Sequence, residues 1–149
     1  MTSRDSSAIP ALQNLERIRK LDAEPPDGRE LRGLLHSARV RLKDSHVASL
    51  SIESRFDLAY NAAHATALAA MRAQGYRSEN RYLVFQCLEH TAGWTAQQWQ
   101  ILNLAHGKRN LAEYEGDLDV TEAFVQALIT CTEALLARVT ALVADLGIA

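Results

Sequence analysis

Two stretches of predicted helix carry polar side chains where alanine and leucine otherwise dominate. In the first, Asp57, Tyr60, Asn61 and His64 follow one another at helical intervals, and Arg55 comes just before them. Spacings of three, four and seven residues place side chains on one face of a helix. Phenol, amide and imidazole groups together can bind a polar substrate, so we interpret these five residues as one wall of a substrate-binding cleft. A solvated face or a buried hydrogen-bond network is the alternative interpretation.

The second stretch carries His106, Arg109, Asn110 and Glu113, again at intervals that share one helical face. An imidazole suits acid–base chemistry near neutral pH, and an arginine can bind a phosphate group through two hydrogen bonds. Gly107 lies in the middle of this stretch, where glycine costs about 1 kcal/mol relative to alanine. That cost favours a packing or access reason for the glycine. For Arg109 the alternative is an ordinary surface or ion-paired arginine.

Several familiar chemistries have no support in the sequence. No Glu-x-x-His pair, His-Glu-x-x-His segment, glycine-rich phosphate loop or Gly-x-Ser-x-Gly turn occurs. The two cysteines, Cys87 and Cys131, lie inside helical patterns and are too few for a structural zinc site. We therefore predict no metal site and no cofactor.

The composition indicates which elements position these residues. Alanine (24 residues) and leucine (21 residues) are abundant in the 149-residue chain, and all three prolines lie at or before Pro26. Alanine and leucine favour helices, whereas loop-rich and strand-rich chains usually need proline at turns and edges. The sequence therefore predicts an all-α protein.

Hydrophobic spacing and stop signals divide the chain into about six helices. We expect them over residues 9–21, 28–47, 52–74, 78–92 and 96–114, and from 119 or 121 onward. The strongest break is Pro25-Pro26-Asp27-Gly28. It separates an N-terminal extension with a short helix (1–26) from a main bundle (27–149). Short connections between long helices predict an antiparallel up-and-down arrangement of five to six helices.

The near-neutral net charge of −2 is unevenly distributed. Residues 1–43 carry a net charge of +3, and residues 111–149 carry −6. A sequence pI near 6.2 is far from that of a strongly basic nucleic-acid-binding domain, so any RNA site must be a local patch. No run approaches about 18 consecutive apolar residues, and the N-terminus lacks the apolar core of a secretory signal. We expect a cytoplasmic protein with no membrane segment.

Two segments resemble the HEPN superfamily of helical proteins. Leu104 to Tyr114 (LAHGKRNLAEY) is similar to its Arg-Asn-x-x-x-His signature, and Ser54 to His64 (SRFDLAYNAAH) resembles the helix that faces the signature. Gly75-Tyr76-Arg77 looks like the turn that follows this helix. The resemblance covers residues 30–145. It implies an antiparallel bundle that forms a homodimer and acts on RNA, often as a metal-independent ribonuclease toxin with an antitoxin partner such as a small nucleotidyltransferase.

The resemblance assigns Arg109 to the motif arginine and Asn110 to the polar residue after it, but Tyr114 stands where the family has histidine. A phenol with an ordinary pKa near 10 is a poor general base at neutral pH. His106 or His64 is the candidate replacement. Arg109 can still hold a phosphate, and Tyr114 can stack on a base. RNA binding therefore survives this substitution more easily than cleavage does.

Two functional hypotheses follow from the sequence. The first is a HEPN-like protein directed at RNA, either a ribonuclease with an altered motif or a binder that has lost cleavage. Its candidate catalytic residues are His106, Arg109, Asn110 and Tyr114. The second is a non-catalytic helical protein for dimerisation or interaction, whose polar residues only satisfy one another.

Overall fold

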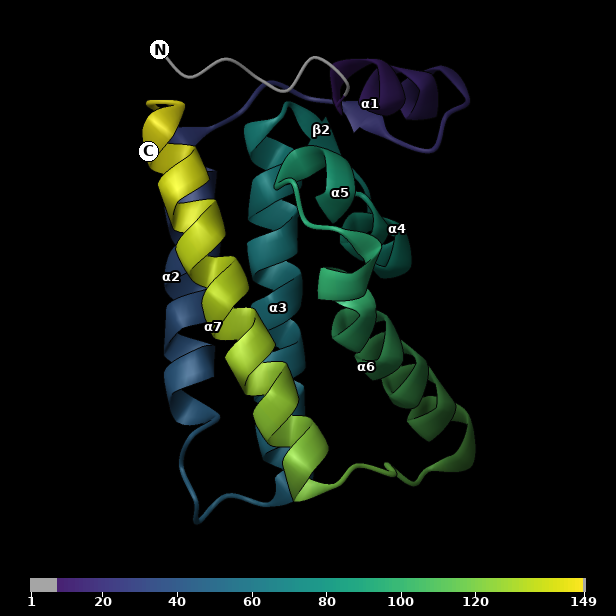
Figure 1. The fold of residues 1–149 in the computed structure, drawn as a ribbon, viewed down its shortest axis with the longest axis vertical. Coiled ribbons are helices and arrows are strands. Elements are labelled where there is room, and N and C mark those ends of the chain that lie inside the picture. Colours follow the sequence, from purple (N-terminus) through teal and green to yellow (C-terminus); the bar gives the residue numbers. More distant parts are fainter. Residues whose placement is uncertain (1–7, 149) are drawn as a thin grey trace.

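The computed structural model describes residues 8–148, and most of them are helical (Figure 1). This confirms the predicted all-α fold class. The elements in chain order are α1 (Ala8–Arg17), β1 (Asp22–Ala23), α2 (Gly28–Asp44), α3 (Ile52–Ala73), β2 (Tyr76–Arg77), α4 (Arg81–Gln86), α5 (Leu88–Thr91), α6 (Ala96–Glu115) and α7 (Glu122–Asp145). Residues 1–7 of the predicted N-terminal extension lie outside the described residues.

Helix α3 is the centre of the bundle. It packs against α2 and α7 on one side and against α4, α5 and α6 on the other (Figure 1). Its many alanines, such as Ala59, Ala63 and Ala67, are fully buried and let these neighbours approach closely. Successive long helices run in opposite directions, as the short connections predict.

Side-chain caps fix where the long helices α2, α3, α6 and α7 begin. Ser51, Thr95 and Thr121 each accept a hydrogen bond from the backbone N–H three residues later, at the starts of α3, α6 and α7. Such caps satisfy N–H groups that have no partner within the helix. Thr95 also forms a reciprocal capping box with Gln98. Helix α2 is capped by Asp27, whose carboxylate accepts from the Arg29 N–H.

The structure departs from the predicted elements in the segment 76–92. One helix was expected over residues 78–92, but α4 and α5 are separate and meet at Cys87. The Cys87 N–H bonds to the carbonyls of both Leu83 and Phe85, and this tightened turn interrupts the helix. The two-residue strands β1 and β2 were not expected and pair antiparallel.

The sequence around Pro25 and Pro26 is fastened to the bundle by Arg72 of α3, which is 1% exposed. Its guanidinium donates to the carboxylate of Glu30 and to the backbone carbonyls of Glu24 and Pro25. Arg77 donates to the carboxylates of Glu24 and Glu30. The predicted boundary at residue 26 is therefore bridged by a continuous network of ion pairs.

Helix α7 combines core packing with high hydropathy. It is long and apolar enough to cross a membrane, with a mean hydropathy of 1.6 over an 18-residue window of which 33% is buried. Leu128, Leu135 and Val139 are buried against the bundle, and a core helix needs such apolar residues. Glu133 and Arg138 interrupt its apolar run. The absence of a membrane segment stays a prediction.

Candidate functional site

A chain of hydrogen bonds connects α3 with α6 through His106. The Tyr60 hydroxyl of α3 lies 3.0 Å from Nδ1 of His106, and Nδ2 of Asn110 lies 3.1 Å from Nε2 of the same ring. The Asn110 amide can only donate from that nitrogen, so Nε2 accepts and Nδ1 carries the proton. His106 is thereby held in one tautomer by residues from two helices.

Two guanidinium groups lie over the face of Tyr60. Cζ of Arg109 is 5.2 Å from the ring centroid, and Cζ of Arg81 is 5.6 Å from it. Both distances are typical of cation–π contacts. Arg81 also donates to Oδ1 of Asn61 at 3.1 Å, while Nδ2 of Asn61 donates to the carbonyl of Asp57.

Arg81 was absent from the residues selected by sequence. It is the first residue of α4 and follows the cap Asn80, so it belongs to neither polar stretch. Its only local signal is its place at the start of a helix that must pack on α3. Only the tertiary packing of α4 against α3 brings it to Tyr60.

His64 is partly buried and lies one turn along α3 from Tyr60. Its ring meets the ring of Phe85 edge-on, with centroids 6.1 Å apart, and its Nε2 is buried without a hydrogen-bond partner. Burial lowers the pKa of His64 to about 4, with further lowering by the charges of Arg81 and Arg109. His64 is therefore neutral at physiological pH.

Burial and the nearby arginines also shift the pKa values of His106 and Tyr60. Burial lowers the pKa of His106, and the charges of Arg81 and Arg109 lower it further. Burial raises the pKa of Tyr60, against the opposing effect of Arg81. Both effects favour the neutral imidazole of His106, which is the form that acts as a general base. We call this site the arginine–histidine cluster; its members are Tyr60, Asn61, His64, Arg81, His106, Arg109 and Asn110.

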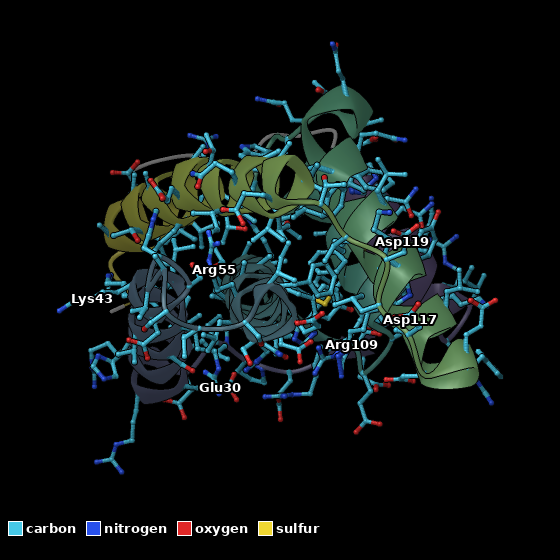
Figure 2. The ribbon with its side chains drawn as sticks, turned by 90° about the horizontal axis from the view of Figure 1, so that it is seen from below. Glu30, Lys43, Arg55, Arg109, Asp117 and Asp119 are labelled. Carbon is cyan, nitrogen blue, oxygen red and sulfur yellow. The ribbon has the colours of Figure 1, made fainter. Side chains whose placement is uncertain are left out.

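Arg55 lies elsewhere, although the sequence grouped it with Tyr60. Figure 2 places Arg55 on the α2 side of α3 and Arg109 on the α6 side. Arg55 donates to both carboxylate oxygens of Glu122, at 2.8 and 2.9 Å, and to the carbonyl of Ser45. It ties the ends of α2, α3 and α7 together. Asp57 has an exposed side chain, and its link to the cluster is through its backbone carbonyl.

Tyr114 is also outside the cluster, because its side chain is 91% exposed near the end of α6. Glu113 forms an ion pair with Arg109 whose nitrogen–oxygen distance is 3.7 Å. Arg109 and His106, by contrast, both reach Tyr60, as expected for a shared helical face. Three of the four catalytic candidates on α6 therefore belong to the cluster, and Tyr114 does not.

Two further residues of α6 lie outside the cluster. Lys108 donates to the carbonyl of Asp119 at 3.0 Å and lies 5.1 Å from the ring centroid of Phe124, so it secures the loop between α6 and α7. A Cβ added to Gly107 would meet no atom within 4 Å. No packing contact within residues 8–148 requires glycine there.

Within residues 8–148, no group of three or more histidine, cysteine, aspartate or glutamate side chains is placed to hold a metal ion. Comparison with protein-family models, curated proteins and solved structures finds no significant match to this chain. The assignment of function therefore depends on the residues of the cluster.

Proposed function

We propose that this protein binds RNA through its phosphate backbone at the arginine–histidine cluster. The observation that carries the proposal is the position of Arg81 and Arg109 over one aromatic ring. Within residues 8–148, the only ion pair that either forms is the 3.7 Å contact between Arg109 and Glu113. Two guanidinium groups whose positive charge is balanced by only one carboxylate at 3.7 Å can bind the oxygens of a phosphodiester.

The cluster forms a local basic site in a chain with a net charge of −2. Its arginines come from α4 and α6, so their separation is fixed by helix packing rather than by a flexible loop. The resemblance of residues 104–114 to the HEPN signature supports RNA as the source of the phosphate, and Arg109 is the motif arginine under that resemblance.

Cleavage of the bound RNA requires a base that removes the proton from a ribose 2′-hydroxyl. His106 fits this role better than Tyr114 does, because its imidazole is neutral and lies beside both arginines. Its Nε2 is the available proton acceptor once Asn110 turns aside. Whether the protein only binds or also cleaves is an outcome of the experiment below.

The test is fluorescence anisotropy with a 5′-labelled single-stranded RNA, combined with a denaturing gel of the same RNA in EDTA. We expect Arg109→Ala and Arg81→Ala to weaken binding about tenfold or more, as for other lost contacts with charged groups. Each substitution should also lower the slope of log K against log salt by about 0.7. Arg39→Ala, an exposed arginine on α2, is the matched control.

If His106→Ala binds RNA but abolishes a cleavage seen with the native chain, His106 is the base. If the Arg81 and Arg109 variants bind RNA as the native chain does, the proposal fails. Loss of stability without any RNA phenotype would favour the second hypothesis, a helical interaction protein.

One observation favours that second hypothesis. Leu104, Leu111 and Tyr114 are exposed on α6, by 47%, 53% and 91% respectively. Exposed apolar side chains grouped on one helix are typical of an interaction surface. We propose that a second copy of this chain covers this face. An antitoxin partner such as a small nucleotidyltransferase and a cytoplasmic location stay predictions from the resemblance.

A further inference from the structure

A cavity of about 520 Å³ lies between α1, the α4–α5 segment and α6. It is distinct from the arginine–histidine cluster, and none of the cluster residues lines it. Tyr82 stands between the two, with its ring 6.5 Å from that of Trp99 and 5.9 Å from that of His106. The volume falls within the range of sites that bind small organic molecules, roughly 300–1,000 Å³.

The walls of the cavity are mainly apolar. Helix α1 contributes Ala11 and Leu15, and Ile18 follows it; the opposite wall includes Leu83. Ile18 is 62% exposed although its neighbours in the sequence, Leu12 and Leu21, are buried and anchor this part of the chain. An apolar guest would remove water from these side chains, which is favourable in proportion to the area covered.

Trp99 provides a rigid aromatic wall. It is 7% exposed, and its indole nitrogen donates to Oε1 of Glu89 at 3.3 Å. This bond fixes the ring plane. It also occupies one oxygen of Glu89, which among residues 8–148 is the only carboxylate that lines the cavity.

The polar residues that line the cavity indicate which charge a bound molecule would carry. Arg17 lines it from α1 and His90 from α5, and neither side chain forms a hydrogen bond or ion pair within the described residues. Arginine keeps its charge at all physiological pH values. Arg17 is an exposed cation at the edge of the cavity and has no partner within residues 8–148, whereas the carboxylate of Glu89 is held by Trp99, so Arg17 can attract a ligand with an apolar body and one anionic group.

We propose that this cavity binds a small amphiphilic anion, a molecule with an aliphatic or aromatic body and a single carboxylate or sulfonate. The apolar body lies against Leu15, Leu83 and Trp99, and the anionic group lies toward Arg17. Because α1 forms one wall, the bound molecule also holds α1 against α5.

The test uses 8-anilinonaphthalene-1-sulfonate, a fluorescent aromatic anion, with the full chain at neutral pH. We expect saturable binding with one site per chain. Ala11→Trp fills the cavity from α1 and should weaken binding about tenfold or more, since the apolar contact area is lost. Gln13→Trp adds the same side chain to an exposed position of α1 that does not line the cavity, and should bind the dye normally. Leu15→Trp replaces Ala11→Trp if the latter does not fold, as judged by circular dichroism.

The charge requirement is tested by displacing the dye with decanoate, decanol and decylamine. Decanoate should displace it at the lowest concentration, and Arg17→Gln should remove the advantage of decanoate over decanol. Lys20→Gln, which changes an exposed cation outside the cavity, should preserve it. Dye binding that the cavity-filling variants leave unchanged would overturn the site, and decylamine displacing best would overturn its preference for anions. RNA binding is measured separately, so neither result depends on the proposed function.

Discussion

The Tyr60 hydroxyl lies 3.0 Å from Nδ1 of His106, and this contact joins the middle of α3 to the middle of α6. Asn110 occupies the other ring nitrogen at 3.1 Å. A histidine held at both nitrogens has a defined tautomer and orientation, which a free surface histidine lacks. The contact therefore links two helices and fixes which ring nitrogen of His106 carries the proton.

Removal of the Tyr60 hydroxyl should allow His106 to adopt both of its neutral tautomers. In Tyr60→Phe, Nδ1 loses its acceptor, so the population of the Nδ1–H tautomer should fall, and the free energy of unfolding should fall by about 1 kcal/mol. Nitrogen-15 NMR of the imidazole ring measures the tautomer directly. Tyr82→Phe is the control, because Tyr82 contacts His106 through its ring. An unchanged tautomer in Tyr60→Phe would contradict the hydrogen-bond assignment.

His64 should make the stability of the protein depend on pH in the acid range. Its pKa is about 4 in the folded chain and 6.5 in its ordinary state, so the unfolded chain takes up the proton first as the pH falls. Its contribution is complete above pH 6.5 and is lost progressively as the pH falls toward 4. The pKa difference corresponds to a loss of about 3 kcal/mol.

His64→Phe keeps an aromatic edge against Phe85 and cannot titrate. Urea unfolding at pH 7.5 and pH 4.5 should therefore show a smaller loss of stability for His64→Phe than for the native chain. His36→Phe, on α2 away from Phe85, is the matched control for a histidine replaced by phenylalanine. Equal pH dependence in the native chain and His64→Phe would rule out a buried, neutral His64.

The sequence predicted the scaffold better than the site. The predicted helix starts at residue 96 and at 119 or 121 are close to the observed starts of α6 and α7, because caps such as Thr95 and Thr121 act on their own helix ends. Arg55 and Tyr60 are five residues apart, about half a turn beyond one full turn of a helix, and which neighbour each would meet depended on the packing of α2 and α6 around α3. Arg81 entered the cluster from a different helix, and nothing in its local sequence predicted that contact.

The buried guanidinium of Arg72 should be among the most important single groups for stability. Arg72→Met removes one ion-pair partner of the Glu30 carboxylate. It also removes the hydrogen-bond donor to the backbone carbonyls of Glu24 and Pro25. We expect a loss of about 3–5 kcal/mol, typical of breaking a buried ion pair. Arg77→Met removes a more exposed partner of the same two carboxylates and should cost less than about 1 kcal/mol. Urea unfolding measures both, and similar losses in the two variants would contradict a special role for Arg72.

The exposed leucines of α6 should determine the oligomeric state. Leu104 and Leu111 are seven residues apart on one face of α6, and burying each against a second copy is worth about 1–2 kcal/mol per leucine. Because Asn110 adjoins this face, a dimer formed there would bring two arginine–histidine clusters near each other. Leu111→Glu should shift the native chain from dimer to monomer in analytical ultracentrifugation at micromolar concentration. Val40→Glu, which places the same charge on an exposed apolar position of α2, should remain dimeric. If the native chain is monomeric at these concentrations, its α6 face is open for a different partner, and one cluster alone must account for any RNA bound.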